Sequence, residues 1–331
     1  MKGQRPFTQF AFSIAAQLEK LNNRLFMGIY FMKKLLGGLM ILALSLPAQN
    51  IHASDSGLAF LRVGVGGRAV GMGEAYAAVA NGAHAAYWNP AGLANGVREV
   101  TFSHNEWIQN IRGEFVGVSF QTGKIGWGFH FLSSHIDGIE LREGPSEDPL
   151  GTFGAESVAT GLSMGLPVND RLDVGMTVKY LYEKIYIENA SGMAVDLGAR
   201  YRFGMSGFTG AVVLRHWGTM NALGEESTNI PTSLRWGLAY AVDQWLGDNG
   251  GLTIALDYEN TSGADGHLLM GAEAQMARVL AARIGYQAGY DDRNISGGIG
   301  LRFSPVTFDY GITPYSSDLG ATHRVSIGFR W

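Results

Sequence analysis

Two short motifs in this sequence match patterns that carry chemistry in other proteins. The segment Gly161–Gly165 reads G-L-S-M-G and fits the nucleophile pattern G-x-S-x-G, which needs a strand, a sharp turn and a helix around its serine. Apolar and small residues alternate around Ser163, so we expect this serine in mid-strand, facing the interior. The segment Gly64–Ala69 fits the loose dinucleotide pattern, but no βαβ unit surrounds it. Neither motif predicts catalysis.

Residue types that bind metals or form thiolates are scattered or absent. The eight histidines show no ligand spacing such as H-x-x-x-H on a helix, and the chain has no cysteine. Lys and Arg number 25 against 29 Asp and Glu, which leaves no basic surface for nucleic acid. We therefore expect no enzyme activity, no cofactor, no metal and no nucleic-acid partner.

The composition favours sheet over helix. Glycine supplies 47 of 331 residues, about twice its usual share of roughly 7%, while charged residues reach only 16%. So much glycine with only 9 prolines excludes a disordered or collagen-like chain. The length suits either two soluble domains or one large barrel.

Alternation at period two dominates the chain from Val100 to Trp331. In the segment 124–133, Ile125, Trp127 and Phe129 share one face, while glycines occupy much of the other. The polar face of a soluble β-sandwich would be rich in Lys, Glu and Thr. Glycine with isolated charges instead indicates a crowded barrel lumen, and segments of about ten residues match tilted strands that cross a bilayer.

These segments predict an all-β fold, a transmembrane antiparallel up-and-down β-barrel of about 14 strands with a short N-terminal helical hatch or plug. Short links alternate with longer ones, such as Ser134–Glu156 and Gly218–Pro231, which places both chain ends on the short-turn, periplasmic side. The chain closes on Phe329 and Trp331, which resemble the C-terminal signal read by the outer-membrane assembly machinery. The predicted strands are 98–104, 113–121, 124–133, 156–166, 172–183, 192–203, 207–217, 232–242, 251–260, 266–276, 279–288, 295–303, 306–314 and 322–331.

The N-terminus has the pattern of a secretory signal. Lys33 and Lys34 precede an apolar run of 12 residues, Leu35–Leu46, and small or polar residues follow it. We assign residues 32–53 to a signal peptide and residues 1–31 to an upstream extension from a start codon placed too early. The alternative is an N-terminal membrane anchor, for which the run is short. The mature barrel is then residues 98–331, preceded by a hatch at 54–97.

Residues 54–97 do not alternate like strands. They suggest two Ala-rich helical pieces, 73–80 and 83–88, separated by Asn81–Gly82 and closed by Asn89–Pro90. Small apolar residues with little charge indicate packing against protein. A plug of the barrel lumen follows from this position before the first strand.

The hatch also carries a family resemblance. The segments Gly67–Ala75 (G-R-A-V-G-M-G-E-A) and Tyr87–Ala94 (Y-W-N-P-A-G-L-A) resemble the N-terminal signature of the PorV/PorQ family, itself similar to FadL-type long-chain fatty acid transporters. One departure is Glu74, where many relatives have a small residue. The resemblance implies a 14-strand barrel in the outer membrane of a Gram-negative-type bacterium, with a hatch. The hatch residues expected to act in structure or gating are Gly67, Arg68, Gly71, Met72, Gly73, Trp88, Asn89, Pro90, Gly92 and Leu93.

Charges of both signs fall on the face predicted to point inward. One interpretation is a salt-bridge network that holds the sheet and the plug, and the other is a path for an ion or ligand. The expected interior charges are Lys179, Arg200, Arg202, Arg235, Asp196, Asp257, Glu273, Arg302 and Asp309, with Arg283, Arg324, Arg330, Asp173 and Glu259 beside them.

Three functions remain open. A PorV/PorQ resemblance implies association with type IX secretion, with secretion proteins or secreted cargo as partners besides lipid and the assembly machinery. A FadL resemblance implies passive uptake of fatty acids, aromatics or other hydrophobic small molecules. The last alternative is a lipid hydrolase using Ser163 and a histidine.

Overall fold

The computed structural model describes residues 57–142, 144, 148–204, 207–226, 228–243, 250–316 and 318–331. The chain divides into two compact units, Met1–Asn50 and Ile51–Trp331. The signal peptide predicted at 32–53 and the extension predicted at 1–31 lie outside the described residues.

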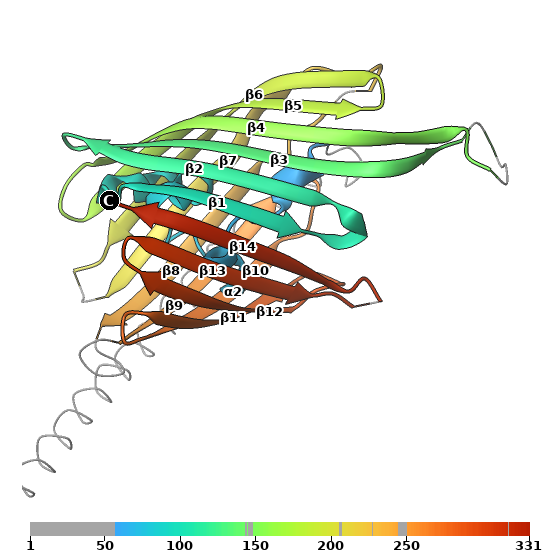
Figure 1. Ribbon diagram of the computed structural model, residues 1–331. Helices are drawn as coiled ribbons and strands as arrows, with labels where there is room; N and C mark the ends of the chain where they lie inside the picture. Colours follow the sequence, from blue (N-terminus) through green and yellow to red (C-terminus); the bar gives the residue numbers. More distant parts are fainter. Residues whose placement is uncertain are drawn as a thin grey trace, which may run out of the picture. The chain divides into compact units, whose positions relative to one another are not determined.

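Fourteen strands in the described residues form one closed antiparallel barrel, in which each strand pairs with its sequence neighbours and β1 pairs with β14 (Figure 1). This confirms the predicted fold class and every predicted strand. The alternation at period two gives each strand one inner and one outer face, and closure pairs the edges of every strand within the barrel wall. The strands are β1 Glu99–Glu106, β2 Arg112–Thr122, β3 Ile125–Leu141, β4 Gly151–Pro167, β5 Leu172–Ile185, β6 Glu188–Arg202, β7 Phe208–Met220, β8 Ser233–Asp243, β9 Gly251–Thr261, β10 His267–Met276, β11 Leu280–Ala288, β12 Ile295–Phe303, β13 Val306–Pro314 and β14 Ala321–Arg330.

One predicted long loop is wrong. Most of the segment 134–156 continues β3 and β4, which pair as far as Leu141 and Gly151 across an irregularity between Ile136 and Ile139. The polar residues of this extension resemble a loop in the sequence, because strands that project beyond a barrel no longer need an apolar outer face. The segment 221–232 after β7 remains a loop, with an isolated bridge inside it. We call the end of the barrel that carries these connections the loop end, and the opposite end the turn end.

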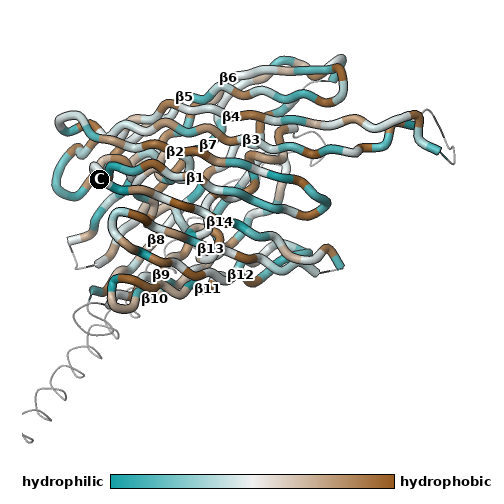
Figure 2. Tube along the Cα trace, viewed as in Figure 1, coloured by the Kyte–Doolittle hydropathy of each residue, from teal (hydrophilic) through white to brown (hydrophobic). Residues whose placement is uncertain are grey.

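The two faces of the strands differ as the alternation predicts, and hydrophobic and hydrophilic residues recur along the strands in Figure 2. On β3 and β4 the outward side chains Phe129 and Leu162 are 44% and 59% exposed, while the inward His130 and Ser163 are buried. Phe329 and Trp331 also lie on the outer side, half exposed, with ring centroids 6.2 Å apart.

Residues 57–97 form short helical turns that pack against the inner face of the barrel. We call this segment the plug. Its elements are η1 Ala59–Arg62, α2 Gly67–Gly71, η2 Gly82–His84, α3 Ala85–Trp88 and η3 Pro90–Asn95, while η4 Ile108–Asn110 lies between β1 and β2. None of the helices in the described residues is long and apolar enough to cross a membrane.

The predicted helix at 73–80 is wrong, whereas helical turns do cover 82–88. Gly73 and Glu74 have φ angles of +62° and +63°, which end the helical path after α2. The segment beyond them makes turns, and charged side chains of the barrel bind its backbone groups. Alanine content alone is therefore not enough to predict a helix at 73–80, because tertiary hydrogen bonds replace helical ones here.

A row of glycines explains how the plug fits. On the inner face of β3–β6, Gly126, Gly165, Gly175 and Gly198 lie directly opposite one another in successive strand pairs. A Cβ atom on Gly175 would stand 2.3 Å from the carbonyl carbon of Pro90, and one on Gly165 would stand 2.6 Å from the Pro90 oxygen. No side chain fits at these positions, so the plug backbone lies directly on the wall.

The opposite wall repeats this arrangement. Gly271 of β10 pairs with Gly285 of β11, and Cβ atoms there would approach the carbonyl oxygen of Met72 to 2.2 Å and the nitrogen of Gly73 to 2.0 Å. Glycine on the inner face is thus required by the close approach of two backbones. The plug therefore packs against glycines on two walls of the barrel, those of β3–β6 and those of β10 and β11.

Candidate functional site

The first half of the hatch motif binds the wall through its backbone. The N–H of Gly67 donates to Ser326 Oγ at 2.8 Å, and the N–H of Gly73 donates to Ser296 Oγ at 3.1 Å. Gly71 lies against β12, where a Cβ atom on Gly71 would be 3.0 Å from the Cα of Gly298. Met72 is fully buried in the plug core.

The second half of the motif ties the plug to itself. Trp88 is buried and its Nε1–H donates to the carbonyl oxygen of Val65 at 3.1 Å. Asn89 donates from Nδ2 to the Ala77 oxygen at 2.8 Å, while its Oδ1 accepts the N–H of Ala91 at 3.0 Å and caps η3. Asn89 therefore caps η3 and also binds the turn that contains Ala77.

Pro90, Gly92 and Leu93 shape the turn that touches β3–β6. Pro90 occupies the first position of η3, where its missing N–H is harmless. Gly92 does not have a positive φ, and glycine is needed there because a Cβ would lie 2.4 Å from the carbonyl oxygen of Ala80. The carbonyl of Leu93 rests on Gly126.

Three of the predicted interior charges bind the plug backbone. Asp257 Oδ2 accepts the N–H groups of Tyr76 and Ala77, both at 2.9 Å. Arg235 Nη1 donates to the carbonyl oxygen of Glu74 at 2.6 Å, and Arg200 Nη1 donates to the Ala80 oxygen at 3.2 Å. Since these plug residues have few helical hydrogen bonds, the wall satisfies buried backbone groups that would otherwise lack partners.

Other predicted charges pair near β5 and β6. Arg200 and Arg202 both bind the buried carboxylate of Asp173, Arg200 through Nη2 at 2.8 Å. Lys179 Nζ lies 2.5 Å from Asp196 Oδ2, and both side chains are fully buried. Each buried charge thus has an opposite charge beside it.

A second group of charges surrounds Glu273 on β10. Arg68 of the plug makes a bidentate pair with this carboxylate, both contacts at 2.8 Å, and Arg283 Nε lies 2.6 Å from it. Arg302 Nη2 is 3.9 Å away, and Asp309 pairs with Arg283 at 2.7 Å. The structure thus brings Arg68, Glu273, Arg302 and Asp309 together, apart from the charges on β5 and β6.

Arg215 and His216 were missed because a β-bulge breaks the alternation on β7. The register between β6 and β7 shifts there, His216 has a φ of +57°, and both consecutive side chains are buried inside the barrel. The His216 N–H donates to Asp196 Oδ1 at 2.8 Å. The Arg215 guanidinium lies 4.6 Å from the ring centroid of Tyr87 and 5.5 Å from that of Trp88. Two adjacent polar residues inside an alternating run were the available signal.

The plug and the loop end enclose a polar cavity of about 380 Å³. We call it the polar cavity. Its size is within the usual range for small-molecule sites. Its lining combines aromatic rings with charges of both signs from the plug, β7–β9 and three connections at the loop end. Its charged and aromatic lining residues include Glu74, Tyr87, Trp88, Trp107, Arg215, Arg235, Glu259, Tyr290, Arg293 and Tyr315.

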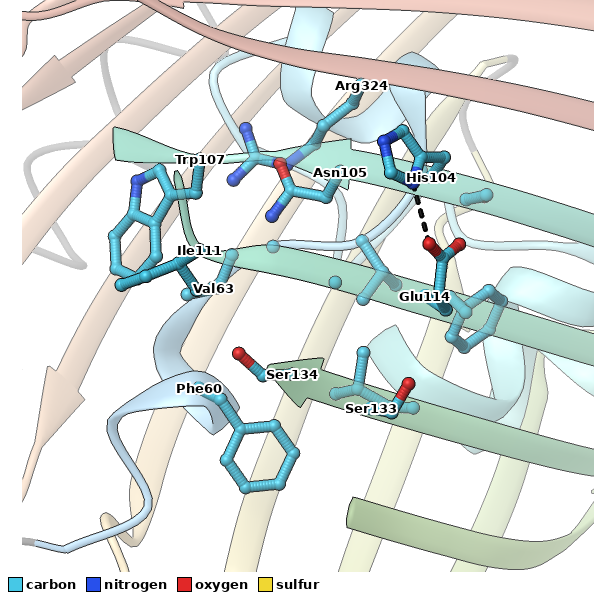
Figure 3. A pocket seen from close by; sticks show the side chains of 17 residues that line it. Phe60, Val63, His104, Asn105, Trp107, Ile111, Glu114, Ser133, Ser134 and Arg324 are labelled. Atoms are coloured by element: carbon cyan, nitrogen blue, oxygen red, sulfur yellow. Dashed lines mark hydrogen bonds and ion pairs between the residues drawn. The ribbon is translucent and has the colours of Figure 1, made fainter. Parts of the chain in front are cut away.

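A second, mostly apolar space lies between the plug and β1–β3, and we call it the apolar cleft (Figure 3). Phe60 and Val63 of the plug face Trp107 and Ile111 across it. The space free for a molecule is only about 20 Å³, roughly enough for one water. A larger ligand must therefore displace side chains.

The apolar cleft has one cationic group. Arg324 is 1% exposed, donates to Thr322 Oγ1 at 3.3 Å, and has no partner for Nε and Nη2 within the described residues. His104 and Glu114 form a pair at 2.7 Å on the same lining, drawn as a dashed line in Figure 3. The cleft therefore combines apolar walls with a few polar groups.

Aromatic and cationic groups interlock above the polar cavity. Tyr315 OH accepts hydrogen bonds from Trp107 Nε1 at 3.0 Å and from Arg293 at 2.8 Å. Arg293 lies 4.1 Å from the ring centroid of Tyr290, which itself stacks on His267 at 3.8 Å. Burial raises the pKa of Tyr290 to about 12, so its hydroxyl stays protonated. This cluster joins the β1–β2, β11–β12 and β13–β14 connections to the first residue of β10.

Neither a metal site nor a serine–histidine pair is found in the part of the chain that the structure describes. No group of three or more metal-ligating side chains occurs there. Ser163 is buried and shares a hydrogen bond of 2.8 Å with Thr177 Oγ1, with the Ala86 oxygen 3.4 Å away. No hydrogen bond joins Ser163 to a histidine in these residues, so the hydrolase alternative has no structural support.

Comparison with known proteins places this architecture. Residues 48–158 match the uncharacterised protein family UPF0164, and no curated protein matches the sequence. Among solved structures, the CymD monoaromatic hydrocarbon channel is similar at a TM-score of 0.59 and 14% identity, over 81% of this chain and 98% of that one. The Pseudomonas putida toluene transporter TodX gives 0.56 and 11% over the same shares. A Pseudomonas aeruginosa FadL homologue gives 0.50 and 10%, over 80% and 98%. The chain therefore has the fold of FadL-like outer-membrane barrels.

Proposed function

We propose that this protein is a passive channel that takes small hydrophobic molecules across the outer membrane of a Gram-negative-type bacterium. The observation that carries the proposal is the apolar cleft, which runs beside the plug from the loop end. Supporting it, solved barrels of the same fold are described as a monoaromatic hydrocarbon channel and a toluene transporter.

The polar cavity and the apolar cleft share Gly64 and Trp107 in their linings, so the two spaces are neighbours and Trp107 lies at their boundary. Trp107 is held by one side-chain hydrogen bond, to Tyr315. A bond of this kind contributes about 1 kcal/mol to holding the indole.

Uptake by purified protein in liposomes tests the proposal. Wild-type protein should accelerate entry of toluene and of a long-chain fatty acid relative to empty liposomes. Trp107→Ala should change the rate severalfold, whereas Trp217→Ala, which removes an outward indole that is 61% exposed, should leave it unchanged. Equal uptake with and without wild-type protein would contradict the proposal.

A secretion-associated role is a second candidate, favoured by one observation. The hairpin of β3 and β4 extends beyond its neighbours, since β2 pairs with β3 only as far as His135 and β5 pairs with β4 only from Ala155. Its free edges offer backbone hydrogen bonds to another strand. The PorV/PorQ-like hatch motif points the same way. Comparison of secreted proteins between wild-type and deletion strains tests it, and an unchanged secretome would remove it.

A further inference from the structure

Glu74 is a buried acid that the barrel leaves without a partner. Its side chain lines the polar cavity, the residue is 4% exposed, and no hydrogen bond or ion pair of its carboxylate exists within the described residues. The backbone at Glu74 has a φ of +63°, which is unfavourable for a residue with a Cβ. A Cβ on Gly64 would stand 2.6 Å from the carboxyl carbon. The positive φ of Glu74 and the missing side chain of Gly64 thus both make room for this carboxylate beside the cavity.

Arg293 supplies the opposite charge without meeting Glu74. It lines the same cavity, is 9% exposed, and has no carboxylate within 4 Å in the part of the chain described. Burial opposes its charge, but the field of Glu74 raises the pKa of Arg293 above its ordinary value. Tyr315 and Tyr290 fix the guanidinium in place, as described above. The two charges therefore attract each other electrostatically but form no ion pair.

Two neighbouring arginines share one carboxylate, that of Glu259. Arg235 binds Glu259 directly, and Arg215 Nη1 lies 3.8 Å from the same carboxylate. Arg62 and Asp292 add one further charge of each sign to the lining. Neither Glu74 nor Arg293 forms an ion pair among the described residues, and the same lining also presents the rings of Tyr87, Trp88, Trp107, Tyr290 and Tyr315.

We propose that the polar cavity binds a small zwitterion with an apolar body, with its ammonium at Glu74, its carboxylate at Arg293 and its body against the aromatic rings. This is the chemistry of a free aromatic amino acid. The inference goes beyond the proposed channel function, since a hydrocarbon needs neither charge. A carboxylic acid alone would face Glu74, and an amine alone would face Arg293. A hydrocarbon would leave both charges desolvated, at a cost to binding.

The test uses the purified full-length barrel and four probes of one skeleton type. Binding of L-phenylalanine, 3-phenylpropanoate, 2-phenylethylamine and toluene is measured by calorimetry and by the fluorescence of the cavity tryptophans. L-Phenylalanine should bind at least about tenfold more tightly than each of the others, the loss expected for one charge-assisted hydrogen bond. Binding of any single-charge probe as tight as that of L-phenylalanine, or no binding of L-phenylalanine, would overturn the proposal.

Two variants assign the charges. Glu74→Gln should remove the preference for L-phenylalanine over 3-phenylpropanoate, and Arg293→Met should remove the preference over 2-phenylethylamine. The exposed residues Glu188 and Arg278 provide matched controls, and Glu188→Gln and Arg278→Met should change neither preference. Unchanged preferences in Glu74→Gln and Arg293→Met would refute the assignment. If a variant fails to fold, seen as loss of the heat-dependent gel shift, the wild-type probe series still decides. Toluene uptake without zwitterion binding would sink this inference alone and leave the channel proposal standing.

Discussion

Removing one wall carboxylate should loosen the plug while leaving the barrel closed. Asp257→Ala takes away the acceptor of the Tyr76 and Ala77 N–H groups, which lie 2.9 Å from Oδ2 and belong to buried residues. Arg235 keeps its contact with Glu259, so the change leaves no isolated cation. The strand pairing of β9 is untouched, because it uses backbone groups.

The size of the effect follows from the two donors. Each buried N–H without a partner costs about 1–3 kcal/mol, so the free energy that holds this part of the plug should fall by about 2–6 kcal/mol. Local opening should then be favoured by about 30-fold to about 10⁴-fold, since about 1.4 kcal/mol is a factor of ten.

Hydrogen exchange measures this opening directly. Peptides that cover residues 74–79 should exchange faster in Asp257→Ala by at least about 30-fold, while peptides from the strands keep their protection. Asp170→Ala, at an exposed position in the turn between β4 and β5, is the matched control and should exchange as wild type does. An increase of less than about threefold in residues 74–79 would refute the view that wall charges hold the plug by its backbone.

Three further predictions concern the plug and the chain end. Gly175→Ala should destabilise plug docking by about 1–3 kcal/mol through the clash with Pro90, measured by exchange of residues 89–95, whereas Gly151→Ala, with open space around it, should not. Burial lowers the pKa of His84, so protonation favours the undocked plug; exchange of residues 82–86 should quicken as pH falls below about 6.5, and His84→Phe should flatten this dependence. Trp331→Ala should reduce the folded, heat-modifiable protein in cells yet leave refolding in detergent unchanged; equal cellular yields would contradict an assembly signal.

Most of the barrel could be predicted because its constraints are local. A strand with one face toward lipid and one toward a crowded lumen must alternate residue by residue, so Phe129 and His130 reveal their faces in the sequence itself. The prediction failed where that constraint ends. Beyond the apolar band, the ends of β3 and β4 have no lipid-facing requirement, and their polar residues resembled a loop.

The plug was less predictable because its conformation depends on distant partners. Ala75–Ala80 is rich in a strong helix former, yet Asp257 and Arg200 of the wall take over its backbone hydrogen bonds. Similarly, the bulge that turns Arg215 and His216 inward together arises from the register of β6 against β7. No local pattern specifies either outcome.

The sequence by itself determined the fourteen strands, their inner and outer faces, and the presence of a small-residue segment before them. Only the tertiary structure decided what the excess glycine and the interior charges do. Glycine lets two backbones touch, and this requirement becomes visible only when Pro90 is seen against Gly175. The charges on the wall mostly bind one another or the plug, while Glu74 and Arg293, 219 positions apart in the chain, meet at one cavity because the closed barrel brings them there.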